Sequence, residues 1–207
     1  MGDETKTTKT TKRSRKCGLK DIYVAKITQN DEKAYVTDTP VKLARAIKAK
    51  IDEKWTSEKV YSDDGVEEII TSYEGTDVEL EVNALAPQDR AILFGQLYEN
   101  GYLVKSSEDK APELALGWRE RQMNGLYDFK WLYCGKFAEG ISEEAQTKEG
   151  KISPTTRTVK GSFYERNLDK EYEISVDETN LINEDTDAKT AIQNWFSKVQ
   201  EKDKGAE

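Results

Sequence analysis

The sequence predicts a mainly β fold, an antiparallel sheet with flanking helices, from three observations. Asn124-Gly125 is a two-residue hairpin signal, because both residues tolerate the positive φ of a type I′ turn. The strand that follows, 127–134, has an aromatic residue at every second position, so these side chains share one face. The segment 185–199 has apolar residues at helical spacing. We expect the central hairpin to organise the sheet and the terminal helix to dock on it.

The aromatic face of the central hairpin has two interpretations. An alternating aromatic stripe is usually core, covered by a second sheet or a helix. The alternative is an exposed platform that binds a ligand. The residues concerned are Tyr127, Phe129, Trp131 and Tyr133.

Further strands and helices are expected on both sides of this hairpin. Pro87 is well placed to begin a helix that stops near Gly95. Asp185 and Asp187 can cap the terminal helix and supply negative charge at its start, whereas a calcium loop would need a glycine and a later glutamate that are missing. The total is about eight strands and two helices. Besides the central hairpin, the expected strands are 19–27, 34–36, 66–73, 78–85, 156–164 and 171–176, with turns at 30–33 and 74–77 and a last hairpin turn at 166–169.

Three segments are less regular. Residues 41–55 fit a helix through Val41, Ala44, Ile47 and Ile51, and a strand through the alternation of apolar and charged residues, so periodicity alone leaves both open. Residues 56–65 are polar and end in a turn signal. Residues 140–153 contain almost nothing apolar and predict a long projecting loop.

The charge divides the chain into three parts, a basic arm at 1–17, a β domain at 18–200 and a short tail at 201–207. Residues 1–16 contain six bases and two acids, a sum of +4, so the remainder carries −8 − 4 = −12. The arm has no apolar residue after Met1 and is expected to be flexible. It is either a solvated tail or a docking arm for a partner, nucleic acid or an acidic face of another copy.

The residue types argue against catalysis. The chain has no histidine, which removes histidine-based acid–base chemistry and most zinc sites. Of the two cysteines, Cys17 and Cys134, Cys17 follows Arg15 and Lys16, a setting that can favour a thiolate, but without a base elsewhere to use it an inert thiol is expected. Gly-rich phosphate loops and nucleophile elbows are absent from the sequence. We therefore expect a non-enzymatic protein with no metal or cofactor. With no apolar run of about 20 residues and no signal peptide, translation in the cytosol is expected.

A set of short motifs, in their order and spacing from Gly18 to Val199, resembles the major tail proteins of long-tailed bacteriophages of Gram-positive bacteria. The basic arm lies outside this resemblance. The motifs are Gly18–Ala25, Tyr61–Asp64 followed by Glu67 or Glu68, Leu93–Gly95, Leu116–Trp118, Gly125–Leu132, Gly135–Phe137, Lys160–Tyr164 and Asn194–Phe196.

The resemblance implies a tail tube fold, an antiparallel β-sandwich or half-barrel flanked by a helix. By this analogy 41–55 is a strand. The subunits would form hexameric rings that stack into a tube around the tape measure protein, and DNA would pass through the lumen. Tail terminator and distal tail proteins would be further partners. The protein would be assembled in the host cytoplasm and located in the virion tail, without contact with a membrane.

The resemblance also suggests roles for individual residues. Glu79 and Glu81, on the polar face of their strand, are proposed to face the lumen, where acidic groups would repel DNA phosphates; a solvated outer face is the alternative. Loops and terminal arms would bridge successive rings. The candidates for these contacts are Lys12, Arg13, Arg15, Lys16, Asp63, Asp64, Glu143, Glu144 and Lys148. A different function, a monomeric β-sandwich that binds a carbohydrate or receptor through the aromatic platform, is kept as the alternative.

Overall fold

The structure, a computed structural model, describes residues 11–62, 65–143 and 156–202. The described chain is mainly β, with one large antiparallel sheet and two α-helices, as the sequence predicts. The strands are β1 (Lys16–Asn30), β2 (Tyr35–Thr37), β3 (Val41–Lys42), β4 (Ala46–Ser62), β5 (Gly65–Val82), β6 (Leu97–Glu99), β7 (Tyr102–Val104), β8 (Leu114–Gln122), β9 (Tyr127–Lys136), β10 (Ile141–Glu143), β11 (Arg157–Tyr164) and β12 (Glu173–Asp177). The helices are α1 (Pro87–Phe94), α2 (Thr186–Gln193) and a 3₁₀ turn at Glu178–Asn180.

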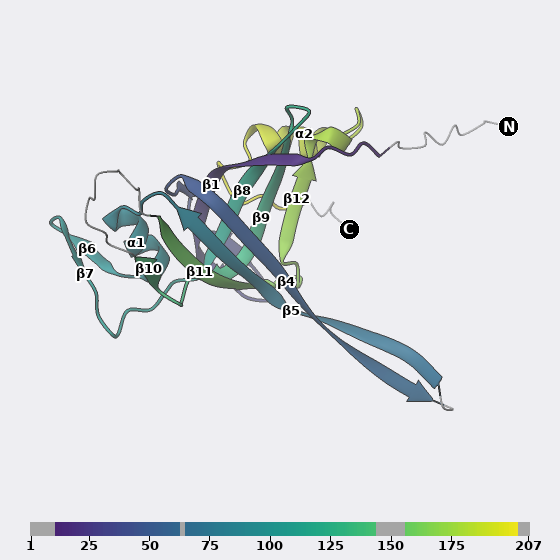
Figure 1. Cartoon of the computed structure of the whole chain (residues 1–207), viewed down its shortest axis with the longest axis horizontal. Helices are drawn as coiled ribbons and strands as arrows, with labels where there is room; N and C mark the ends of the chain where they lie inside the picture. The colour runs from purple at the N-terminus through teal and green to yellow at the C-terminus, as the bar shows by residue number, and fades with distance from the viewer. Residues whose placement is uncertain (1–10, 63–64, 144–155, 203–207) are drawn as a thin grey trace, which may run out of the picture.

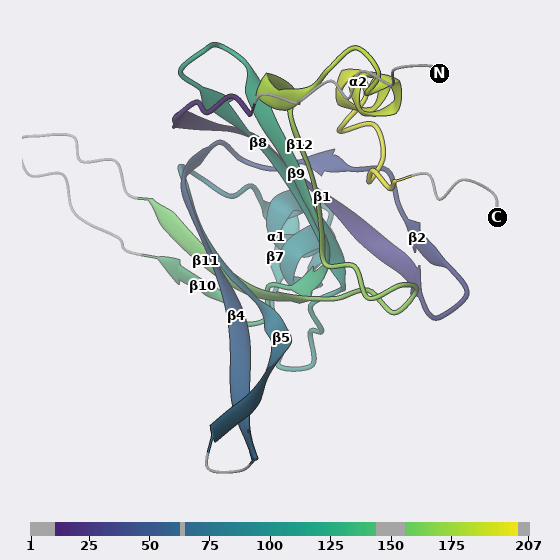
Figure 2. The ribbon, with the colours of Figure 1, turned by 90° about the vertical axis from the view of Figure 1, so that its right-hand side faces the viewer.

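The large sheet runs in the order β2-β1-β8-β9-β11-β5-β4, and every pairing in it is antiparallel. Strand β3 pairs with β1, β10 with β11, and β12 with β9. β6 and β7 form a separate hairpin beside α1 (Figure 1). β4 and β5 continue far beyond the body of the molecule as a two-stranded ribbon, which is plain in both views (Figures 1 and 2).

The sheet is curled, because one apolar cluster joins its two ends. Ile22 of β1 and Leu116 of β8 share this cluster with Leu80 of β5 and Val159 of β11. Helix α1 adds Leu93 to the same cluster. Side chains from both halves of the bent sheet therefore fill one interior.

The second apolar cluster lies on the other face of β9 and confirms that the aromatic stripe is core. Phe129, Trp131 and Tyr133 are buried there, against Trp195 and Val199 of the C-terminal segment. The indole N–H of Trp131 donates to the backbone oxygen of Trp195 at 3.1 Å. The prediction that the C-terminal apolar residues dock on the sheet is therefore confirmed.

The terminal helix is shorter than predicted and is capped differently. It ends at Gln193, and Trp195 and Val199 reach the core from the turns that follow. The Asp185 carboxylate accepts a hydrogen bond from the backbone N–H of Ile182 at 2.9 Å, a residue before the helix. It makes no capping bond within α2. By contrast, α1 begins at Pro87 and stops before Gly95, at φ 68°, as expected.

The central turn differs from the predicted type I′ form. Only Gly125 has a positive φ, of 87°, and the N–H of Gln122 donates to the oxygen of Leu126 at 2.8 Å, so the loop holds three residues. Asn124 is held by its side chain, which accepts from the N–H of Leu126 and donates to Thr179. These bonds to a neighbouring segment favour the longer turn.

Three predicted connections are wrong, and β pairing explains each of them. Residues 56–62 lie in β4 rather than in a polar loop, Gly65 begins β5, and 74–77 does not separate two strands: β4 and β5 pair from Ala46 opposite Val82 to Ser62 opposite Gly65. The segments β11 and β12 do not form a hairpin, because both pair with β9, at opposite ends of that strand. The predicted loop at 140–153 begins with β10, and its residues 144–153 lie outside the described chain.

Residues 41–55 are strand rather than helix, in β3 and β4 with a break between them. The described residues contain twelve strands rather than about eight, because the short strands β3, β6, β7 and β10 have too few residues to show a clear alternation. The 1–17 arm runs into β1 at Lys16, and its residues 12–15 contact the domain. The backbone N–H of Lys12 donates to the Asn180 side chain, the N–H of Asn124 donates to the Ser14 hydroxyl, and the N–H of Met123 donates to the backbone oxygen of Arg15.

Gly117 allows β8 to pack against the largest core side chain. It lies directly opposite Trp131, and a Cβ on Gly117 would come within 2.7 Å of the indole ring. We expect Gly117→Ala to lower the free energy of unfolding by about 1–3 kcal/mol, because an overpacked core must shift. Gly18→Ala is the control, since a Cβ there would meet its nearest atom only at 3.9 Å. Chemical denaturation measures both, and equal stabilities would contradict this packing.

Candidate functional site

Charged side chains of the body form ion pairs with other residues of the same chain. Arg166 is the clearest case: its guanidinium is buried, lies 4.0 Å from the centre of the Tyr133 ring, and pairs with Asp169, Glu171 and Glu201. Glu201, in the predicted tail 201–207, therefore contacts the body. A group of three or more residues with the ligand types for a metal ion does not occur in the described ranges. This cluster acts as a structural link and offers no open site.

The two thiols differ in accessibility. Cys17 is exposed on β1, whereas Cys134 is buried on β9. Burial raises the pKa of the Cys134 thiol to about 11, so the reactive thiolate is scarce at neutral pH. Neither cysteine lies in a disulfide.

This difference predicts that the native chain reacts with one equivalent of an aromatic disulfide reagent at pH 8, at Cys17. Unfolding in guanidinium should release the second thiol. A Cys17→Ser variant should lose the native reaction and keep the denatured one, and rapid native labelling of this variant would contradict the burial of Cys134.

The outer part of the β4–β5 hairpin projects beyond the body, and most of its side chains are exposed. We call residues 53–62 and 65–76 the ribbon. At roughly 3.3 Å per residue, the ten residues from Glu53 to Ser62 span about 30 Å. The ribbon carries six large apolar side chains that are at least one third exposed: Trp55, Val60, Tyr61, Val66, Ile69 and Ile70. Exposed apolar residues gathered on one projecting element mark a site of interaction.

The strand register sorts these side chains onto two faces, because residues directly opposite each other point the same way. Trp55 lies opposite Tyr73, Lys59 opposite Ile69, and Tyr61 opposite Val66. Alternation along β4 puts these pairs on one side, which we call the apolar face. Trp55, Tyr61 and Ile69 are 52%, 67% and 55% exposed.

The opposite face of the ribbon is more polar. Glu58 lies opposite Ile70, and Val60 opposite Glu68. The apolar face thus gathers the aromatic residues, while the polar face mixes carboxylates with two aliphatic side chains. A ribbon with one apolar and one polar face is suited to lying on another surface.

An aromatic clamp fixes the base of the ribbon to the body. The ring of Tyr73 stacks on Tyr172, with centroids 4.1 Å apart, and Trp55 packs edge-on against Tyr73 at 5.3 Å. The hydroxyls of Tyr73 and the buried Thr76 lie 2.7 Å apart. At Gly75, with φ 142°, a Cβ would approach the Phe163 backbone oxygen to 2.9 Å, so the ribbon leaves the body through a position that requires glycine.

Glu79 and Glu81 lie on the outer face of β5, on the side opposite the buried Val78, Leu80 and Val82, as predicted. Their surroundings are charge-balanced rather than acidic. Glu79 lies between Lys50 of β4 and Lys160 of β11, and Glu81 lies opposite Lys48 and accepts a hydrogen bond from Thr156 at 2.8 Å. The expectation of an acidic face is wrong, because the lysines of the neighbouring strands point the same way.

The residues proposed to join successive rings fall into three groups in the structure. Lys16 pairs with Glu120 and Asp128 of its own chain, and Glu143 pairs with Arg90 and Arg157. Lys12, Arg13 and Arg15 are exposed, with no ion pair in the described part of the chain. Asp63, Asp64, Glu144 and Lys148 lie outside the described residues.

The apolar face of the ribbon was missed by sequence reasoning. Trp55, Ser57, Lys59 and Tyr61 would share one face of a strand, and the aromatic residues at both ends of this series were the available signal. The polar residues around them suggested a loop instead. No described helix has the length and apolar character needed to span a membrane. Neither known family models nor curated proteins show a match to this chain.

The clamp predicts that Tyr172→Ala loosens the ribbon. A stacked aromatic pair contributes about 0.5–1.5 kcal/mol, so we expect trypsin to cut after Lys54 or Lys59 several times faster than in the wild type. Tyr172→Phe keeps the ring and is the control. Unchanged cleavage in the alanine variant would show that the stack does not hold the ribbon.

Proposed function

We propose that the protein is a structural tail tube subunit that polymerises as stacked hexameric rings around a tape measure protein and forms a conduit for DNA. It would act in the virion tail, with tail terminator and distal tail proteins at the two ends of the tube. The observation that carries this proposal is the ribbon, whose apolar face the subunit leaves open to water.

An isolated two-stranded ribbon is marginally stable in water. Here it extends about 30 Å while exposing Trp55, Tyr61 and Ile69, an arrangement that a neighbouring protein surface would stabilise by burial. Strand β4 and strand β12 each pair on one side only within the described chain, so both offer edges. Ring closure between copies would cover such edges, which otherwise template aggregation.

The proposal has Glu79 and Glu81 facing the lumen of the tube. Glu79 and Glu81 lie on a solvent-facing side of β5, as a lumen position requires. The lysines beside them reduce the local negative charge, so repulsion of DNA would need further acidic groups in the assembled ring.

The alternative, a monomeric binding module, loses its proposed platform. The aromatic residues expected to contact a carbohydrate or receptor are those of β9, and Phe129, Trp131 and Tyr133 are buried under the C-terminal segment. Burial of this platform supports assembly over the binding module, with the ribbon as the proposed site.

The proposal predicts tubes with a central channel when the purified full chain is concentrated, seen by negative-stain electron microscopy. Tyr61→Thr/Ile69→Thr, on the apolar face, should abolish tubes or raise the concentration needed at least about tenfold, since burying two such side chains contributes roughly 3–5 kcal/mol. Threonine keeps the β propensity of the strand.

The control is Val60→Thr/Ile70→Thr, which removes two exposed apolar side chains from the opposite face. We expect it to assemble nearly as well as the wild type. Compact monomers from the wild-type chain across concentration and salt, with and without preformed tail ends as templates, would contradict the proposed function.

A further inference from the structure

A second exposed apolar surface lies on the β6–β7 hairpin. Leu97 lies opposite Val104, and Glu99 lies opposite Tyr102, so these four residues share one face. Leu97, Tyr102 and Val104 are 57%, 75% and 52% exposed. On the other face, Tyr98 and Leu103 are only partly exposed. We call the set Leu97, Glu99, Tyr102 and Val104 the receiving face.

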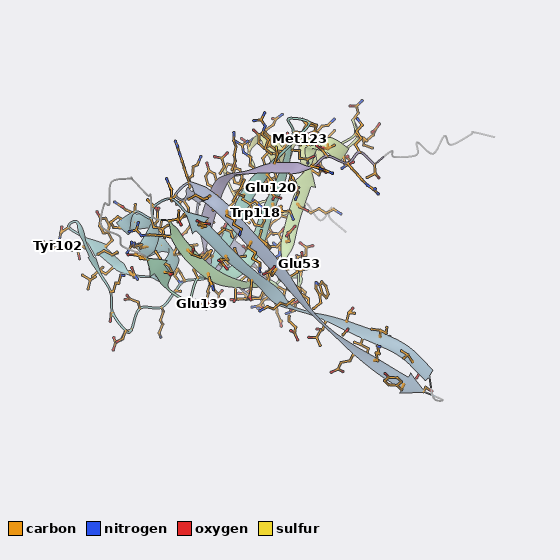
Figure 3. All side chains as sticks on the ribbon, in the orientation of Figure 1. Glu53, Tyr102, Trp118, Glu120, Met123 and Glu139 are labelled. Carbon is orange, nitrogen blue, oxygen red and sulfur yellow. The ribbon has the colours of Figure 1, made fainter. Side chains whose placement is uncertain are left out.

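The ribbon and the receiving face lie at opposite ends of the long axis of the molecule (Figure 1). In Figure 3, Tyr102 marks one extreme of the body, and Glu53 marks the base from which the ribbon leaves toward the other extreme. One chain cannot bring the two surfaces together, but two copies arranged head to tail can. A contact of this kind leaves a free ribbon and a free receiving face at the ends, so it repeats.

The charges of the two surfaces are complementary. Lys59 lies on the apolar face of the ribbon, across from Ile69, and Glu99 lies on the receiving face, across from Tyr102. Both are exposed, and neither forms an ion pair within the described ranges. Each surface thus presents aromatic and aliphatic side chains beside an unpaired charge, and the two charges have opposite signs.

We propose that the apolar face of the ribbon of one copy docks on the receiving face of the next copy, with Lys59 paired to Glu99. This inference rests on the proposed function, since it names the surface that receives the ribbon between successive rings. Aromatic side chains supply most of the buried area, and the charge pair fixes the register of the contact.

Outside the ribbon and the receiving face, the most exposed large apolar side chain in the described residues is Met123, at 73%, in the β8–β9 turn (Figure 3). It stands at the tip of a three-residue turn next to Asn124 and does not belong to a flat strand face. The strand face of β6–β7 offers an extended ribbon a longer contact than this turn does. Met123 therefore provides the competing docking position in the test.

Disulfide cross-linking in assembled tubes tests this contact. In a Cys17→Ser background, one protein carries Ile69→Cys, and a second, size-tagged protein carries Tyr102→Cys. The two are mixed as minor fractions into an excess of the Cys17→Ser protein, so that most contacts in the tube keep their native side chains. The assembled tubes are oxidised with a copper(II) complex in air, and the mixed dimer is measured on a non-reducing gel. We expect at least about five times more mixed dimer than from Ile70→Cys with Tyr102→Cys, or from Ile69→Cys with Met123→Cys.

A charge exchange gives a second readout that does not depend on introduced cysteines. Lys59→Glu and Glu99→Lys should each raise the concentration needed for assembly several-fold, and the double variant should return to within about twofold of the wild type. Both positions are exposed, so the folded subunit should be unaffected, as circular dichroism would check.

The outcomes separate the two proposals. Tubes that form without the Ile69–Tyr102 cross-link, that cross-link to Met123 instead, or that show no rescue by the charge exchange would overturn the docking contact and leave the tube subunit standing. Absence of tubes from the wild-type chain, with templates present, would overturn the proposed function itself.

Discussion

The burial of both faces of β9 is the constraint on which the rest of the structure depends. Leu132 faces the inside of the curled sheet, and Trp131 faces the C-terminal segment. The sheet must bend so that β5 and β11 cover the first face, and the chain must return after α2 to cover the second. Gly117 is required across from Trp131 because the indole occupies the volume of any side chain there.

The ribbon is a consequence of how that core is filled. Ala49 and Ile51 of β4 and Val78 and Leu80 of β5 supply the wall of the curled sheet, but both strands stay paired well past these residues, with register shifts at Trp55 and Tyr61. By alternation along β4, Trp55 lies on the same side of the strand as Ala49 and Ile51. The clamp of Tyr73 on Tyr172 holds the ribbon where it leaves the body. The exposed apolar face of the ribbon is therefore held in a fixed direction relative to the body.

The sequence predicts what depends on local pattern and fails where partners are distant. The aromatic stripe, helix α1 from Pro87 to Gly95, and the buried Val78, Leu80 and Val82 follow from spacing alone. The ribbon was missed because Thr56, Ser57 and Glu58 are polar, and only pairing with β5 makes them strand. The balance of charge around Glu79 was missed for the same reason, since Lys50 and Lys160 come from strands far away along the chain.

In the proposed assembly, the polar residues of the ribbon limit which surfaces it can bind. A fully apolar ribbon would bind any exposed surface and aggregate. Glu58 and Glu68 on the polar face keep that side in water, and Lys59 interrupts the apolar face between Tyr61 and Ser57. Because an unpaired charge is costly to desolvate, this lysine disfavours contact with a purely apolar surface and accepts one that supplies a carboxylate. The same residue that weakens association in general therefore favours a specific partner, and it confines the ribbon to a surface with matching charge and shape.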